Sequence, residues 1–217
     1  MRLGRVLVGL LPAQPEVHGL LALMELQASR LPARSGPDGS AVLLAEQDRH
    51  RWDRLLIRRG LQALARAESL DAPVGPYTLQ AAIAACHARA ATAVETDWRR
   101  IADLYTVLAH LWRNPVVELN RAVAVGFAEG PEAGLALLDA LDTAALPGYA
   151  PLAAVRGDLL ARVGRTELAA AEFRRAAALT GNERERALYR AHAAAAEEAP
   201  PPPAGASPAP IDHELGA

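Results

Sequence analysis

The chain has 217 residues, of which 51% are hydrophobic but only 4% aromatic, so alanine and leucine supply most of the material for a core. Its formal net charge of −2 excludes a global electrostatic attraction to nucleic acid or to acidic membranes. The single cysteine, Cys86, excludes an internal disulfide and a zinc site made of several cysteines. No run reaches the roughly 18 apolar residues of a membrane span, so the sequence predicts a cytoplasmic protein.

The N-terminal third of the chain predicts helices separated by short breaks. Leu3–Leu11 is an apolar helix ended by Pro12, and Pro15 begins a second helix that runs to about Arg30. Between Glu46 and Glu68 apolar side chains recur at helical spacing. Residues 1–72 are therefore predicted to form the N-terminal helices, with an incomplete first repeat.

The rest of the chain predicts three helix pairs with a regular period. The breaks within the pairs fall at Thr96, Gly130 and Gly164, and the two intervals between them are equal (130 − 96 and 164 − 130). This interval is the period of the tetratricopeptide repeat, a helix–turn–helix unit of about 34 residues. The predicted pairs are 77–89 with 97–111, 116–128 with 131–141, and 151–162 with 166–179.

The last pair also has the side chains that such a repeat needs. Small residues at Gly157, Ala169 and Ala176 let two helices approach closely, while Leu160 and Phe173 fill the space between them. We therefore predict an all-α fold, a right-handed stack of antiparallel helix pairs, with three tetratricopeptide-like repeats over residues 73–198. Residues 199–217 are rich in proline and alanine and are predicted to form a disordered tail.

Several segments, taken in order, carry a resemblance to a known family. Together they resemble the C-terminal extension of a group of bacterial extracytoplasmic-function sigma factors, in which a tetratricopeptide-like domain follows two DNA-reading sigma domains. The resemblance covers residues 2–195, and nothing in this chain resembles the two sigma domains. The segments are Gly9–Arg30, Leu43–Gly60, Pro76–Ala88, Thr96–Tyr105, Asn114–Val125 and Asp158–Arg165.

The resemblance implies a regulatory protein-interaction domain that acts in transcription initiation. Its implied partners are sigma domains, core RNA polymerase or another regulator, and direct DNA binding by this chain alone is not expected. Two alternatives stay open. The chain could be a stand-alone tetratricopeptide-like scaffold, or a small-molecule sensor that binds through its concave groove.

Two groups of residues are candidate binding sites. Gln47, Asp48, Arg49 and Arg51 belong to the densest polar cluster and are predicted to be a docking surface; the alternative is the start of a helix with Trp52 anchored in the core.

The second candidate follows from the repeat frame, which places His87, Asn120 and Arg121 on the predicted groove. Arg121 offers a planar fork of donors for a carboxylate, and Asn120 is costly in an apolar helix unless it is hydrogen-bonded. The alternative is that Asn120 holds a neighbouring loop and Arg121 pairs with a surface carboxylate.

Residue spacing predicts neither catalysis nor a metal or cofactor. Cys86 and His87 are adjacent, so on a helix their side chains diverge by about 100° and cannot act together as nucleophile and base. The six histidines show no spacing typical of a zinc site. A run of arginines from Arg49 to Arg66 is interrupted by acidic residues, and only Trp52 could stack on a base. A solvated helix face is the favoured interpretation of that run.

Overall fold

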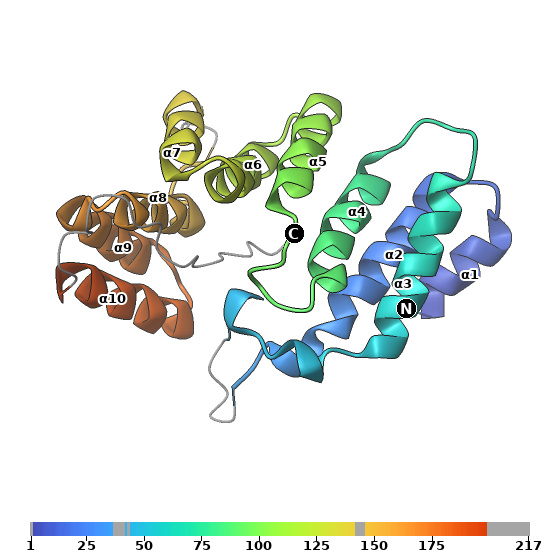
Figure 1. The fold of residues 1–217 in the computed structure, drawn as a ribbon, viewed down its shortest axis with the longest axis horizontal. Coiled ribbons are helices and arrows are strands. Elements are labelled where there is room, and N and C mark those ends of the chain that lie inside the picture. Colours follow the sequence, from blue (N-terminus) through green and yellow to red (C-terminus); the bar gives the residue numbers. More distant parts are fainter. Residues whose placement is uncertain (1, 37–41, 43, 142–145, 199–217) are drawn as a thin grey trace. The chain divides into compact units, whose positions relative to one another are not determined.

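The computed structural model describes residues 2–36, 42, 44–141 and 146–198, and these ranges are folded into α-helices joined by turns (Figure 1). The all-α prediction is confirmed. The described residues form two compact units, one within residues 1–42 and 46–113 and one within residues 43–45 and 114–217. The predicted tail, 199–217, lies outside the described residues.

The described residues of the first unit form five α-helices: α1 (Arg2–Leu10), α2 (Pro15–Ser29), α3 (Arg54–Glu68), α4 (Pro76–Arg89) and α5 (Trp98–Leu111). The helix α2 packs against both α3 and α4, and Figure 1 shows the three side by side. Gly19 allows this close approach, because a Cβ at that position would lie 2.7 Å from the backbone nitrogen of Thr78 on α4. Leu26 on α2 and Leu64 on α3 are fully buried.

A carboxylate on one helix caps the N-terminus of another. Glu16, in the first turn of α2, accepts hydrogen bonds from the backbone nitrogens of Tyr77 (2.8 Å) and Thr78 (3.0 Å) at the start of α4. The first amides of a helix have no partner within that helix, and a negative charge there also complements the helix dipole. Pro76 occupies the position where a missing N–H costs nothing. Local sequence around α4 gives no sign of this distant cap.

The predicted helix from Glu46 to Glu68 is shorter in the structure. It begins only at Arg54, after two 3-10 turns, Leu44–Glu46 and Arg49–Arg51. Asp53 causes this start, because its carboxylate accepts hydrogen bonds from the backbone nitrogens of Leu55 and Leu56. A third 3-10 turn, Leu31–Ala33, follows α2. The single helix predicted from Glu46 to Glu68 is therefore two separate elements in the structure, a 3-10 turn capped by Asp48 and a helix capped by Asp53.

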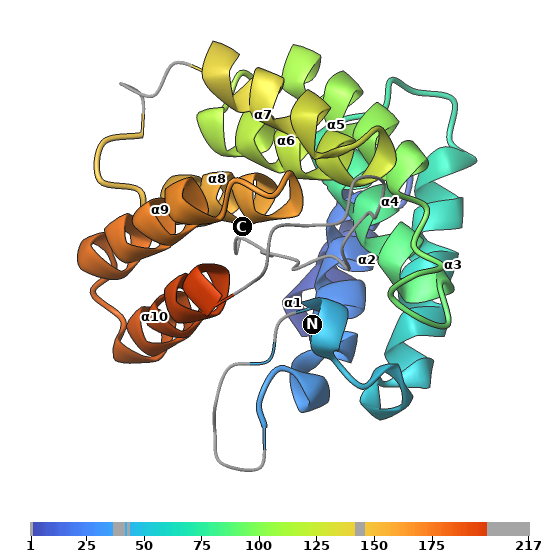
Figure 2. The ribbon, with the colours of Figure 1, turned by 60° about the vertical axis from the view of Figure 1, so that its left-hand side comes forward.

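Five α-helices also form in the part of the second unit that the structure describes: α6 (Pro115–Ala128), α7 (Pro131–Ala140), α8 (Ala150–Arg162), α9 (Thr166–Leu179) and α10 (Glu183–Glu198). The helix α9 packs against both α8 and α10, and Figure 2 shows these three together. Phe173 is buried on α9 and its ring lies 3.0 Å from where a Cβ of Gly157 would be, as the predicted packing requires. The last helix, α10, was not among the predicted pairs.

Candidate functional site

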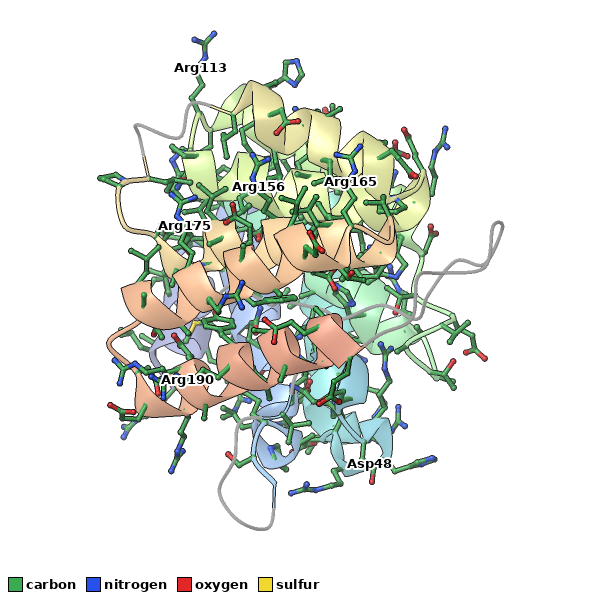
Figure 3. The ribbon with its side chains drawn as sticks, turned by 90° about the vertical axis from the view of Figure 1, so that its left-hand side faces the viewer. Asp48, Arg113, Arg156, Arg165, Arg175 and Arg190 are labelled. Carbon is green, nitrogen blue, oxygen red and sulfur yellow. The ribbon has the colours of Figure 1, made fainter. Side chains whose placement is uncertain are left out.

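The polar segment that begins at Gln47 folds into a capped turn. Asp48 is exposed (Figure 3), and its carboxylate accepts a hydrogen bond of 2.9 Å from the backbone nitrogen of His50. This bond starts the 3-10 turn Arg49–Arg51. The turn directs Arg49 and Trp52 into the first unit, where they are 6% and 3% exposed. Only part of this segment is therefore exposed on the surface.

Arg49 holds together three parts of the first unit. Its Nη1 donates hydrogen bonds to the carbonyl oxygens of His87 (2.7 Å) and Ala90 (2.8 Å), at the end of α4 and just beyond it. Its Nη2 donates to the hydroxyl of Thr96 (3.1 Å), which precedes α5. The Arg49 guanidinium also lies 4.9 Å from the ring centre of Trp52. This arginine fixes the loop between α4 and α5 onto the turn before α3.

His87 is part of the same buried structure. Its ring meets that of Trp98 edge to face, with 5.3 Å between the centroids. Burial, with smaller contributions from the positive charges of Arg30 and Arg49, lowers the pKa of His87 from 6.5 to about 3. The side chain is therefore neutral at neutral pH and surrounded by protein. This placement does not suit a residue that lines an open groove.

The four residues of the predicted docking surface do not share one environment. Gln47 is buried, and its Nε2 donates to the carbonyl oxygen of Val42 (3.2 Å). Arg49 is buried as described above. Asp48 and Arg51 are exposed. A docking surface made from these four residues would thus consist of Asp48 and Arg51 alone, because the other two side chains face inward.

The predicted groove residues lie in different units. His87 is on α4 of the first unit, while Asn120 and Arg121 are on α6 of the second, where both are half-buried. The Nε of Arg121 donates to a carboxylate oxygen of Glu118 at 2.7 Å, one turn earlier on the same helix. That ion pair is the arrangement expected of a structural surface arginine. The groove at Asn120 and Arg121 remains a prediction.

Cys86 and His87, the two adjacent residues weighed for catalysis, are both buried on α4. Cys86 is buried, and burial, reinforced by the charge of Asp97, raises the pKa of its thiol. Across the part of the chain that the structure describes, no three His, Cys, Asp or Glu side chains gather as a metal site would require. In the same residues, no helix combines the length and the apolar character that crossing a membrane demands.

A second exposed feature is the basic face of α3, which the sequence predicts to be a solvated surface. We define this face as Arg54, Arg58, Arg59 and Arg66, all of which are exposed. The opposite side of α3 is buried and faces α2. The sequence contained the signal that identifies it, since from Arg54 to Ala67 the helix contains four arginines and no acidic residue.

Comparisons with known proteins find two similarities and no assigned activity. Residues 1–68 match a family of unknown function, DUF6596. The chain is also similar to an uncharacterised protein of Rhizobium meliloti (strain 1021), with 47% identity over 190 residues. That match covers 88% of this chain but 44% of the relative, so the chain spans less than half the length of that protein. No solved structure matches the chain.

Proposed function

We propose that this chain is a regulatory protein-interaction domain of an extracytoplasmic-function sigma factor and that it acts in the cytoplasm at transcription initiation. The observation that carries the proposal is the ordered set of six segments between Gly9 and Arg165 that resemble the C-terminal extension of those factors. The chain would supply contacts to sigma domains or to core polymerase, and no catalytic step.

The length of the relative supports this proposal. The match covers 44% of that protein, so more than half of it lies outside the match. A chain of that size has room for two sigma domains beside a region similar to this one. The proposal therefore expects the unmatched part of the relative to bind core polymerase and to read a promoter.

The helix spacing supports the finer proposal of a tetratricopeptide-like array. In the second unit the first helices of two successive pairs, α6 and α8, begin at positions 115 and 150. Their second helices, α7 and α9, begin at positions 131 and 166, so both intervals are the same. The interval lies close to the tetratricopeptide period of about 34 residues with two helices per unit. The contact between Gly157 and Phe173 is the kind of close packing that such a pair needs.

A pull-down with two baits tests the function. The folded chain is offered to purified core RNA polymerase and, separately, to the unmatched part of the Rhizobium relative. Retention on either bait at physiological salt supports a role in transcription initiation. A variant with Asp48→Ala and Arg51→Ala tests whether the exposed part of the predicted docking surface contributes. A matched variant with Asp139→Ala and Arg156→Ala removes one exposed carboxylate and its partner arginine in the second unit.

The negative result has a definite meaning. If a helical, cooperatively melting sample binds neither bait, the sigma-factor proposal is refuted and a stand-alone scaffold becomes the better interpretation. Binding of the wild-type chain with equal loss in both double variants would refute the docking surface while leaving the function intact.

A further inference from the structure

The basic face of α3 has an unusual charge environment for this chain. The whole sequence carries a net charge of −2, yet four arginines stand on one exposed helix face without an acidic residue between them. Arg54 and Arg58 are one turn apart, whereas the side chains of the adjacent Arg58 and Arg59 diverge by about 100° around the helix. Like charges one turn apart cost a few tenths of a kcal/mol, and cations near the start of a helix oppose its dipole. Arg54 and Arg58 therefore do not serve the stability of α3, whereas Arg66 lies in its last turn, where a cation complements the dipole.

Several arginines of the second unit show the contrasting arrangement. Arg156 pairs with Asp139, Arg174 with Glu197, and Arg175 with Glu172. Within the described ranges, by contrast, Arg58 and Arg59 have no carboxylate within ion-pair distance. The charges of these two arginines are therefore available to another molecule.

The surroundings of the face favour a protein over a nucleic acid. Leu55 is 45% exposed and lies one turn before Arg59, so an apolar contact is available among the charges. Helix α3 has no aromatic side chain on which a base could stack. Arginine with an apolar neighbour is also typical of protein–protein interfaces.

We propose that the basic face of α3 docks an acidic, amphipathic helix of a partner protein. Its carboxylates would pair with Arg58 and Arg59, whose planar forks suit bidentate carboxylate binding, and an apolar side chain would cover Leu55. From Arg54 to Arg66 the face spans about 18 Å, at about 1.5 Å per residue, which is about three turns of such a helix. This inference does not depend on the partner being a sigma domain or polymerase.

A labelled model peptide tests the inference on the full chain. The probe is a helical peptide with glutamates one turn apart along one edge and leucines beside them, and its fluorescence anisotropy reports binding. The wild-type chain should bind it, and the variant with Arg58→Glu and Arg59→Glu should lose roughly tenfold or more in affinity. The variant with both arginines changed to lysine keeps the charge but loses the fork, and should show an intermediate loss.

The chain offers a closely matched control. Arg174 and Arg175 are also adjacent exposed arginines on a helix, and reversing both changes the net charge by the same amount. That variant should bind the peptide as the wild type does. Each variant is first shown to keep the wild-type circular dichroism spectrum and melting temperature, so that a loss of binding does not reflect unfolding.

Three results would overturn the inference. One is absence of peptide binding by the wild-type chain. Another is an equal loss of affinity in the Arg174 and Arg175 variant, which would mean attraction to net charge rather than to this face. The third is displacement of the peptide by duplex DNA of equal charge at equal or lower concentration, which would assign the face to nucleic acid.

Discussion

Arg49 and Arg51 are two residues apart in a segment predicted to be a docking surface, but the structure gives them opposite surroundings. Arg49 is 6% exposed and donates three hydrogen bonds, to the end of α4, to the residue that follows it and to the start of α5. Arg51 is exposed and makes a long 3.4 Å hydrogen bond to the carbonyl oxygen of Ser35. Replacing each by alanine separates a structural role from a binding role.

The expected magnitudes differ by several kcal/mol. A hydrogen bond from a charged donor contributes about 1.5–3 kcal/mol, and Arg49→Ala also leaves two carbonyl oxygens and a hydroxyl without their donor. The lost contact with the Trp52 ring adds about 1 kcal/mol. These contributions are not additive, and water entering the vacated space offsets part of them. We expect Arg49→Ala to lower the free energy of unfolding by about 3–5 kcal/mol, and Arg51→Ala by less than about 0.5 kcal/mol.

Urea unfolding, followed by circular dichroism and by tryptophan fluorescence, measures both changes. Trp52 and Trp98 lie in the first unit, so their fluorescence reports on the unit that contains Arg49. The expected result is a lower midpoint for Arg49→Ala at the same slope, with Arg51→Ala unchanged. Equal midpoints for the two variants would refute the assignment of Arg49 to the interior. Arg49→Lys should recover only part of the loss, because one ammonium cannot reach all three acceptors.

Three further predictions concern packing, titration and the groove. Gly157→Val should lower the free energy of unfolding by about 1–3 kcal/mol through overlap with Phe173, which lies 3.0 Å from the added Cβ. The same change at Gly9, which has no atom within 4 Å of that position, is the thermal-melt control. The His87 ring is neutral in the folded chain but becomes protonated in the unfolded chain below pH 6.5. The free energy of unfolding should therefore fall as the pH decreases from 6.5 toward 3, by at most about 1.4 kcal/mol per pH unit. His87→Phe should remove that slope between pH 6.5 and 5 in urea titrations. Arg121→Ala should leave the melting temperature unchanged and weaken partner binding, and an unchanged affinity would retire the groove hypothesis.

The helices themselves could be predicted because their signals are local. Apolar periodicity, prolines at first turns and capping side chains lie within a few residues of the elements they define. Asn114 shows this well: it precedes Pro115, and its side chain accepts a hydrogen bond from the backbone nitrogen of Val116 at the start of α6. The prediction of a single helix from Glu46 was wrong because periodicity continued through two local caps at Asp48 and Asp53.

The candidate sites were harder to predict because exposure depends on contacts between distant residues. The spacing of Arg49 and Arg51 gives no information on which of them meets the carbonyl oxygens of His87 and Ala90, which are about forty positions away along the sequence. Likewise, the repeat period placed His87 on a groove, while its ring packs against Trp98 and feels the charges of two buried arginines. A repeat frame gives the helix face only if the helices pack alike in every repeat.

Two pairs of adjacent arginines show that the availability of a surface charge also depends on residues that are distant in the sequence. Arg58-Arg59 and Arg174-Arg175 are the same dipeptide, and both pairs are exposed on a helix. The second pair is neutralised by Glu172 on its own helix and by Glu197, which α10 brings alongside, whereas the first pair has no such neighbour among the described residues. Whether a basic pair is a solvated surface or an available binding charge is therefore decided in part by carboxylates that are remote in sequence. If α3 binds an acidic helix and α9 does not, these carboxylates, and not the arginines, determine where this chain makes contact.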